Sequence, residues 1–291
     1  MQNLDSRAKY GGYLSLGAAL RLVTTQIANQ SANARLDAEL LVMSVCGVSR
    51  TELITRQENA LTEVQVRQLY ELVSRRKKGE PIAYLTRTRE FWSMELAVSP
   101  ATLIPRPETE VLVEQALACI PAGADWTIAD IGTGCGAIAL ALASERPSCR
   151  VIATDQVQDA LDIARENAAR HRLSTVTFRH GSWLEPLAGE TMDVIVSNPP
   201  YVRTGDPHLT SGDVRFEPVD ALAAGADGLD AIRHIVTHAQ SCLRMRGWLL
   251  LEHGYDQGAS VTRIMRQSRY INITTHQDLA DRERVTRCQA P

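Results

Sequence analysis

The stretch Ala129-Asp130-Ile131-Gly132-Thr133-Gly134-Cys135-Gly136-Ala137 decides the fold. An apolar strand pattern, Thr127–Ile131, leads into its glycines, and a helical pattern near residues 137–145 follows them. Glycines at a strand-to-helix turn let a ligand approach the backbone closely at the helix N-terminus. The alternative is a tight turn whose glycines only let the helix pack on the strand. With strand, loop and helix in this order, we predict a site for a nucleoside-bearing cofactor.

Asp155 and Trp183 extend the predicted cofactor site. Asp155 ends the next strand, where an acid can bind both hydroxyls of a ribose. The loop and this acid also fit a nicotinamide enzyme, because Gly132-x-Gly134-x-x-Ala137 satisfies a loose dinucleotide-binding pattern. Trp183 follows the third strand, where it either stacks on an adenine or serves as an ordinary core or rim residue.

Apolar runs and helical patterns alternate along the chain after residue 126, which is the rhythm of a doubly wound parallel sheet. The predicted strands are Thr127–Ile131, Val151–Thr154, Val176–Phe178, Val194–Val196 and Trp248–Leu251, and the predicted helices lie near 137–145, 157–170 and 228–245. Ile271–Thr275 and Arg284–Arg287 predict a C-terminal hairpin around Asp278–Asp281. We therefore expect a Rossmann-like α/β domain whose mostly parallel sheet ends in an antiparallel hairpin.

The N-terminal part of the chain reads as a small all-helical domain. Apolar residues recur at helical spacing from Leu14 to about Lys78, and two capping boxes, Ser49-Arg-Thr-Glu52 and Thr62-Glu-Val-Gln65, mark helix starts. The run Arg75-Arg76-Lys77-Lys78 favours a helix C-terminus over a nucleic-acid patch, because Gly79 follows it. We predict a helical domain over residues 1–79, a hairpin linker over 80–107 and a catalytic domain over 108–291.

Composition excludes several classes of protein. The 291 residues are 44% hydrophobic and 22% charged, as in an ordinary globular protein. A net charge of −3 gives no general attraction to nucleic acid. No apolar stretch is long enough to span a membrane, and the N-terminus MQNLDSRAKY lacks a secretion signal, so we expect a cytoplasmic protein. Six scattered cysteines indicate reduced thiols and no metal site.

Asn198-Pro199-Pro200-Tyr201 follows the fourth predicted strand, at the sheet edge where ligands bind in such folds. The two prolines stiffen the loop and remove two donors, so its carbonyl groups can face a substrate. We hypothesise that the Asn198 side-chain oxygen and the Pro199 carbonyl accept both N–H protons of a planar amide or amino group. The nitrogen then faces an activated sulfonium methyl group, and Tyr201 packs on the flat substrate. The alternative is an ordinary turn.

The chain closely resembles class I S-adenosylmethionine-dependent methyltransferases of the PrmC or HemK family, which modify the glutamine of the Gly-Gly-Gln motif in bacterial release factors. The resemblance spans almost the whole chain. It rests on the glycine loop, Asn198–Tyr201, Arg35-Leu-Asp-Ala-Glu39, Gly79-Glu-Pro-Ile-Ala-Tyr84, Arg89-Glu-Phe-Trp92, Leu103-Ile-Pro-Arg-Pro-Glu-Thr-Glu110 and Gly212-Asp-Val-Arg-Phe-Glu-Pro218.

The resemblance implies a reaction and the residues that carry it. S-adenosyl-L-methionine is the cofactor, S-adenosyl-L-homocysteine is its product, and the protein substrates are bacterial class I peptide chain release factors. Cofactor contacts are implied for Gly132, Thr133, Gly134, Cys135, Gly136, Asp155, Trp183 and Asn198. Asn198, Pro199 and Tyr201 are implied as catalytic, and the glutamine is held by Asn198, Pro199, Pro200 and Tyr201. We add Arg106, Glu108 and Glu110 as predicted substrate-binding residues, although Pro107, Glu108 and Glu110 also suit an ordinary helix first turn.

Two positions depart from the family pattern. Cys135 stands where the family commonly has threonine, and its place near a helix N-terminus could lower the pKa of its thiol. Arg87 replaces a usual glycine before Arg89 and could alter the linker turn. We expect neither change to disturb the reacting loop.

Four rival functions can be weighed from the sequence. An N6-adenine methyltransferase of DNA or RNA solves the same chemical problem with a similar loop, as does a glutamine methyltransferase of a ribosomal protein, whose pattern lacks Pro107–Glu110. A cofactor-binding adaptor without turnover would show a damaged loop, whereas Asn198–Tyr201 is intact. A metalloenzyme has little support, because Ile235 stands between His234 and His238 where a general base would be needed. We expect no direct contact with nucleic acid or membrane.

Overall fold

The computed structural model describes residues 13–291, and the chain divides between Arg87 and Thr88 into two compact units. Residues 1–12, on which the expected lack of a secretion signal depends, lie outside the described residues. The predicted linker over 80–107 is shared between the units. Its first part forms helix α6 (Ile82–Thr86) in the first unit, and its hairpin belongs to the second.

The first unit is helical, with its apolar core between the helices α2 (Leu16–Ile27), α3 (Ala34–Cys46), α4 (Arg50–Thr55) and α5 (Glu63–Lys77). Both predicted capping boxes are confirmed: the Ser49 and Thr62 side chains cap α4 and α5, and Glu52 and Gln65 return the hydrogen bond. The basic run lies in the last turn of α5, where Arg75 pairs with Glu80. These contacts favour the helix-end interpretation of the run.

Arg87 ends α6 with a φ of 61°, in the left-handed region that favours glycine. An arginine there costs about 1 kcal/mol more than glycine. This backbone conformation accounts for the usual glycine at the position.

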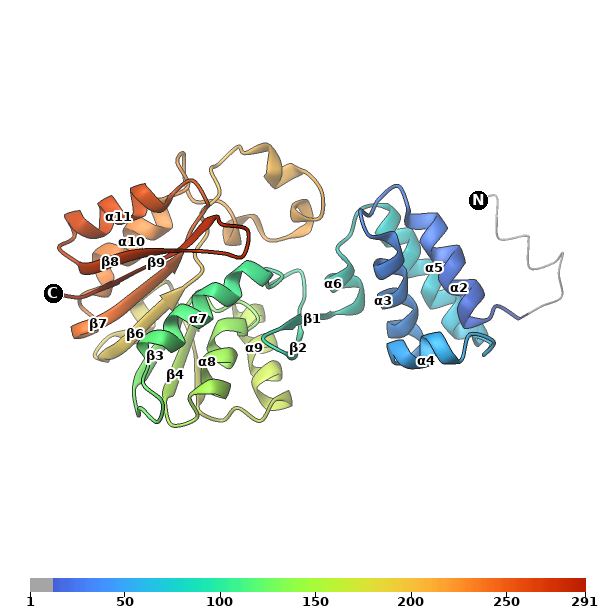
Figure 1. The fold of residues 1–291 in the computed structure, drawn as a ribbon, viewed down its shortest axis with the longest axis horizontal. Helices are drawn as coiled ribbons and strands as arrows, with labels where there is room; N and C mark the ends of the chain where they lie inside the picture. The colour runs from blue at the N-terminus through green and yellow to red at the C-terminus, as the bar shows by residue number, and fades with distance from the viewer. Residues whose placement is uncertain (1–12) are drawn as a thin grey trace. The chain divides into compact units, whose positions relative to one another are not determined.

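The second unit contains a seven-stranded mixed sheet in the order β5-β4-β3-β6-β7-β9-β8 (Figure 1). Its first four strands and β7 are parallel, and β9 pairs antiparallel with both β7 and β8. The strands are β3 (Thr127–Ile131), β4 (Arg150–Asp155), β5 (Val176–His180), β6 (Met192–Ser197), β7 (Leu243–Glu252), β8 (Ile271–Gln277) and β9 (Glu283–Gln289). The predicted fold class, including the antiparallel C-terminal hairpin, is confirmed.

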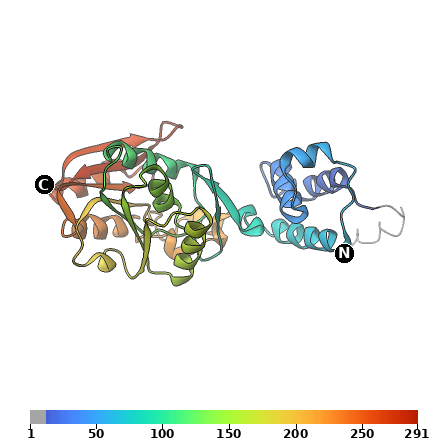
Figure 2. The same ribbon diagram turned by 90° about the horizontal axis from the view of Figure 1, so that it is seen from below.

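Helices cover both faces of this sheet (Figure 2). Helices α10 (Asp230–Ala239) and α11 (Gly258–Gln267) bury their apolar faces on one face of the sheet, α10 against β7 and α11 against β8 and β9. The helices α7 (Glu110–Cys119), α8 (Ala137–Glu145) and α9 (Gln158–Arg170) pack on the other face. A two-stranded hairpin, β1 (Thr88–Phe91) with β2 (Met94–Ala97), precedes the sheet. The layers leave the carboxyl ends of β3, β4 and β6 at one edge.

The prediction of one helix over residues 228–245 was wrong in length. Helix α10 ends at Ala239, and β7 already begins at Leu243, five residues before the predicted strand. Apolar residues at 239, 242 and 243 continue the helical spacing, which hides the turn between the two elements. The first part of β7 is irregular, because its pairing with β6 shifts register between Met192 and Val194. Helix α11 was not predicted.

Candidate active site

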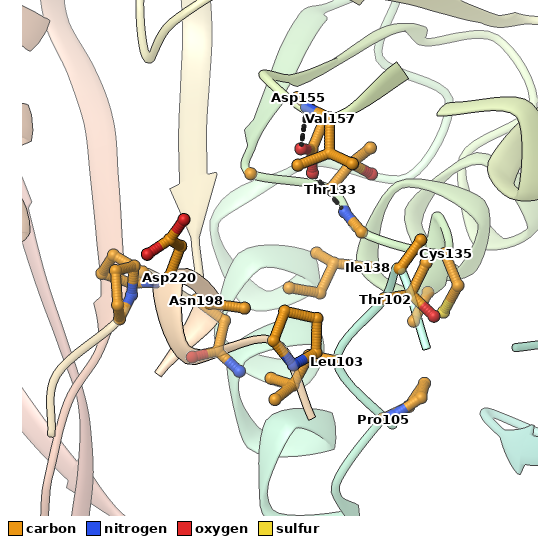
Figure 3. A pocket seen from close by; sticks show the side chains of 18 of the residues that line it. Thr102, Leu103, Pro105, Thr133, Cys135, Ile138, Asp155, Val157, Asn198 and Asp220 are labelled. Atoms are coloured by element: carbon orange, nitrogen blue, oxygen red, sulfur yellow. Dashed lines mark hydrogen bonds between the residues drawn. The ribbon is translucent and has the colours of Figure 1, made fainter. Parts of the chain in front are cut away.

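A cavity opens at the carboxyl ends of the parallel strands, beside the glycine loop (Figure 3). Its wall includes residues 132–135, Asp155 and Trp183 on one side and residues 198–200 on the other. The segment that precedes α7 contributes Thr102, Leu103 and Pro105. Pro218, Asp220 and Ala221 complete the wall. The sequence-predicted cofactor residues and the reacting loop therefore share one cavity, except that Gly136 and Tyr201 are not among its lining residues.

The glycine loop forms a cradle of exposed backbone. Gly132, Gly134 and Gly136 have φ angles of 72°, 56° and 89°, which L side chains rarely adopt. A Cβ atom placed on Gly132 or Gly134 would meet no protein atom within 4 Å, so it would stand in the cavity itself. Gly136 instead faces Ala164, whose Cβ would lie 3.2 Å from the added atom. Two glycines thus leave room for a ligand, and the third lets helices pack.

Asp155 ends β4 with its carboxylate held at the cavity wall (Figure 3). One oxygen accepts from the Gly134 N–H at 2.8 Å, and the other accepts from the Val157 N–H at 2.9 Å. Each oxygen keeps a further lone pair, which suits the vicinal hydroxyls of a ribose. The Trp183 ring lines the same cavity and also packs on the hydrophobic core, with His234 at 5.6 Å between ring centroids.

Asp130 is a buried carboxyl group that the sequence reasoning did not select. One oxygen accepts from the Thr133 hydroxyl at 2.6 Å and from the Ala139 N–H at 3.2 Å, while Oδ1 has no partner. Burial raises its pKa to about 7. Asp130 is 0% exposed and is not among the cavity-lining residues, so it holds the glycine loop from beneath through Thr133. The acid that faces a cofactor in the cavity is Asp155, whose free lone pairs suit a cofactor that carries ribose hydroxyls.

The expectation of a lowered pKa for Cys135 was wrong. Its thiol lines the cavity but is only 2% exposed, and burial raises its pKa to about 12. Desolvation of the thiolate therefore outweighs any benefit from the nearby start of α8. Cys135 fills space beside the cofactor site as a neutral thiol.

The reacting loop leaves β6 at Asn198. The Asn198 side chain lies at the cavity wall (Figure 3). Its nitrogen donates to the Thr109 hydroxyl at 3.1 Å, and Pro199 and Pro200 also line the cavity. Tyr201 is not among the cavity-lining residues. Its ring packs against the hydrophobic core, and its hydroxyl donates to Glu252 at 3.1 Å. Thr109 and Glu252 were missed by sequence reasoning, because each contacts the loop across a long sequence separation.

The segment Arg106–Glu110 is divided in the structure. Arg106 and Thr109 line the cavity, and Arg106 forms an ion pair with the buried Glu217. Glu108 and Glu110 are not among the lining residues, and Glu110 accepts from the Trp92 N–H at 3.0 Å. Its carboxylate thus holds the β1–β2 turn. Substrate contacts for these two acids remain a prediction.

His234 and His238 lie side by side on α10, with ring centroids 4.4 Å apart. Within residues 13–291 no group of three or more His, Cys, Asp or Glu side chains could hold a metal ion.

In that same range no helix combines the length and the apolar character needed to cross a bilayer. All six cysteines have free thiols.

Gly228 offers a test of how strictly the loop is placed. Its φ is 74°, and an added Cβ would lie 2.3 Å from the Tyr201 carbonyl oxygen. We expect Gly228→Ala to displace the end of the reacting loop and to lower kcat about 10-fold or more, measured as turnover at saturating substrate. Gly189→Ala is the matched control, because its φ is 81° and its Cβ would meet nothing within 4 Å. Equal kcat values for the two variants would show that the loop tolerates displacement.

The chain is similar to known proteins along nearly its whole length. The PrmC N-terminal domain family matches residues 18–86, and the methyltransferase small domain family matches residues 108–213. The release factor glutamine methyltransferase of Salmonella typhimurium is 51% identical over 252 residues, covering 87% of this chain and 91% of that protein. The release factor glutamine methyltransferases of Escherichia coli and of a Xylella fastidiosa strain are each 49% identical, over 88% of this chain and 92% and 94% of theirs.

Solved structures share the fold of the second unit at low sequence identity. A methyltransferase from Pyrococcus furiosus has a TM-score of 0.52 at 17% identity, covering 74% of this chain and 96% of its own. A 16S rRNA guanine methyltransferase of Thermus thermophilus, solved with AdoMet and guanosine, has a TM-score of 0.51 at 17% identity, covering 70% of this chain and 50% of its own. These likenesses identify a fold that methyltransferases use.

Proposed function

Because the chain belongs to the family of release factor glutamine methyltransferases, we propose that it methylates the side-chain amide nitrogen of the glutamine in the Gly-Gly-Gln motif of peptide chain release factors. One observation carries this proposal: identity near 50% to these enzymes extends over about nine tenths of each protein. The intact loop Asn198–Tyr201 at the carboxyl end of β6 supports it further. The nitrogen takes the methyl group from the sulfonium and releases one of its two N–H protons to solvent, so the product is neutral N5-methylglutamine.

The cofactor is S-adenosyl-L-methionine, which supplies the methyl group as an activated sulfonium and leaves as S-adenosyl-L-homocysteine. The cradle of Gly132 and Gly134 and the carboxylate of Asp155 would hold its nucleoside and amino acid parts. Trp183 would pack against its adenine ring. Thr133, Cys135 and Gly136 shape the same loop without contributing a reacting atom.

The substrate amide nitrogen is a poor nucleophile, because its lone pair is delocalised into the carbonyl group. The loop therefore has to orient it. The Asn198 side-chain oxygen and the Pro199 carbonyl accept its two N–H protons, which turns the nitrogen lone pair toward the methyl donor. As positive charge develops on nitrogen, these hydrogen bonds strengthen and stabilise the transition state more than the ground state. Pro200 keeps the carbonyl groups in place, since its ring restricts the backbone.

An adenine N6 amino group presents the same two protons, so DNA or RNA is the rival substrate. We propose a protein substrate and no direct nucleic acid contact. When a purified release factor and adenine-containing DNA and RNA strands are offered together with labelled S-adenosylmethionine, we expect label only in the protein. Label in either nucleic acid would contradict this part of the proposal. The net charge of −3 supports the expected result.

The helical unit supplies the proposed docking function. A release factor is a folded protein that presents one glutamine on an exposed loop, so recognition needs contacts beyond the reacting loop. Exposed apolar side chains on α3, Leu36 and Leu40, offer such contacts. We propose bacterial class I release factors as the substrates and the cytoplasm, where translation ends, as the place of reaction.

A double variant, Leu36→Ser with Leu40→Ser, tests docking by α3. We expect its KM for the whole release factor to rise while its kcat stays unchanged. An unchanged KM would argue against docking by α3.

A further inference from the structure

Gln257 is a buried residue that the proposed mechanism does not yet use. It lies between β7 and α11, directly before the first residue of that helix, and is 5% exposed. Its backbone is fixed on both sides, because its N–H donates to the Gly254 carbonyl at 2.9 Å and its own carbonyl accepts from the Val261 N–H at 2.9 Å. The side chain therefore starts from a well-defined position.

The side-chain amide of Gln257 binds backbone groups of three segments. Its oxygen accepts from the Gly254 N–H at 2.8 Å. Its nitrogen donates to the Tyr201 carbonyl at 3.0 Å, with the Asp227 and Gly228 carbonyls at 3.3 Å and 3.4 Å as further acceptors. A backbone N–H can only donate and a backbone carbonyl can only accept, so these partners fix the orientation of the amide.

Two glycines leave the room that this amide occupies. A Cβ atom on Gly228 would lie 2.9 Å from the Gln257 side-chain nitrogen, and one on Gly254 would lie 3.0 Å from its side-chain oxygen. Neither position admits a larger residue without movement of the amide. The amide is therefore closely packed on both sides.

The Tyr201 carbonyl is the point where this amide reaches the reacting loop. Tyr201 is the last residue of the loop, and Asn198 at its start donates to the Thr109 hydroxyl at 3.1 Å. The two prolines between them have restricted φ angles, so a shift of the Tyr201 carbonyl carries the Pro199 carbonyl with it. An error of about 1 Å in the placement of a reacting group can lower a rate about 10²-fold. The far end of the loop therefore needs an anchor as much as its start.

We propose that Gln257 is a positioning residue, which fixes the far end of the reacting loop through the Tyr201 carbonyl. It thereby keeps the two proposed acceptors, the Asn198 side-chain oxygen and the Pro199 carbonyl, aligned with the substrate nitrogen. Gln257 is not among the residues that line the cavity, so it acts through the loop and not by contact with substrate or cofactor. This inference rests on the proposed function, because it concerns the placement of those two acceptors.

Gln257→Glu tests the proposal with little change in volume. A carboxylate still accepts from the Gly254 N–H, but it has no proton to donate and repels the Tyr201 carbonyl oxygen. At about pH 8, where a carboxyl group is ordinarily ionised, we expect kcat to fall about 10- to 100-fold. We expect KM for the release factor and Kd for S-adenosylmethionine to stay within about twofold, because neither binding surface changes.

Gln257→Met separates the bond to Tyr201 from the bond to Gly254. Methionine has a similar length, has no donor at any pH and offers the Gly254 N–H only a weak acceptor. If the bond to the Tyr201 carbonyl carries the effect, the glutamate and methionine variants lose kcat to a similar extent, and KM stays unchanged in both. A normal kcat in Gln257→Glu, or a loss confined to Gln257→Met, would overturn the proposal.

Gln289→Glu is the matched control. The Gln289 side chain makes bonds of the same kind, since its nitrogen donates to the Arg246 carbonyl at 2.9 Å and its oxygen accepts from Asn272 at 2.7 Å. Its partner in β7 is Trp248, at the end of that strand away from the reacting loop. We expect this variant to keep the wild-type kcat. Equal losses of kcat in Gln257→Glu and Gln289→Glu would contradict the positioning role.

The failure of this inference can be told apart from the failure of the proposed function. A wild-type protein that does not methylate the release factor glutamine would contradict the function itself. A wild-type protein that does so, together with a normal kcat in Gln257→Glu, would contradict only the positioning role.

Discussion

Asn198→Ala lowers kcat about 10²- to 10³-fold, while the Kd for S-adenosylmethionine rises less than about fivefold. The expected loss in kcat is large because the side-chain oxygen of Asn198 is one of two acceptors proposed to orient the substrate nitrogen, and its bond strengthens in the transition state. The variant also leaves the Thr109 hydroxyl without the donor that lies 3.1 Å away. Single-turnover methyl transfer measures the first effect and calorimetric titration of the cofactor the second.

Asn198→Asp and Asn59→Ala serve as the comparisons for this variant. An aspartate keeps an acceptor oxygen toward the substrate but loses the N–H bond to Thr109, so we expect turnover between that of wild type and Asn198→Ala. Asn59 is exposed in a turn of the first unit, and its replacement should change neither kcat nor Kd. Near-normal turnover in Asn198→Ala with cofactor bound would exclude the proposed mechanism.

Asp155→Ala weakens the binding of S-adenosylmethionine about 10²-fold. The variant removes a charged acceptor for the ribose hydroxyls, and hydrogen bonds to charged groups contribute about 1.5–3 kcal/mol each. It also removes the acceptor of the Gly134 N–H, which holds the glycine loop at 2.8 Å from the carboxylate. Calorimetric titration gives the Kd, and we expect kcat at saturating cofactor to fall much less than the affinity.

Asp159→Ala is the control for this charge change. Asp159 lies exposed in the first turn of α9, four residues after Asp155, so its removal costs only a few tenths of a kcal/mol in helix stability. A Kd within about twofold of wild type in Asp155→Ala would show that the ribose does not depend on this acid.

The sequence allowed the fold and the center of the site to be predicted because their signals are local. The glycine loop and Asn198 each follow a strand directly, Asp155 is the last residue of β4, and the carboxyl ends of parallel strands meet at one edge. The end of α10 was misplaced because apolar residues continue at helical spacing into β7. Helix α11, which follows β7, was missed altogether. Tertiary packing, which the spacing does not report, decides where that helix stops.

The residues that hold the loop were not predictable in the same way. Asn198 contacts Thr109 across 89 residues, and Tyr201 contacts Glu252 across 51. The Tyr201–Glu252 pair arises from the order of strands in the sheet, which places β7 beside β6. The Asn198–Thr109 pair arises from the packing of α7, which Thr109 precedes, against β6. The sequence held a weak signal for Glu252. This acid comes directly after the apolar run Trp248–Leu251, just as Asp155 stands at the end of the strand β4. An acid at the carboxyl end of a buried strand is therefore worth selecting as a candidate.

The glutamine specificity of methyl transfer is the central claim. Its most direct test is incubation with labelled S-adenosylmethionine and a purified release factor, either intact or with the glutamine of its Gly-Gly-Gln motif changed to alanine. Peptide mapping by mass spectrometry then locates the label. We predict label on that glutamine in the intact factor and none in the changed factor. Equal labelling of the two factors would contradict the assignment.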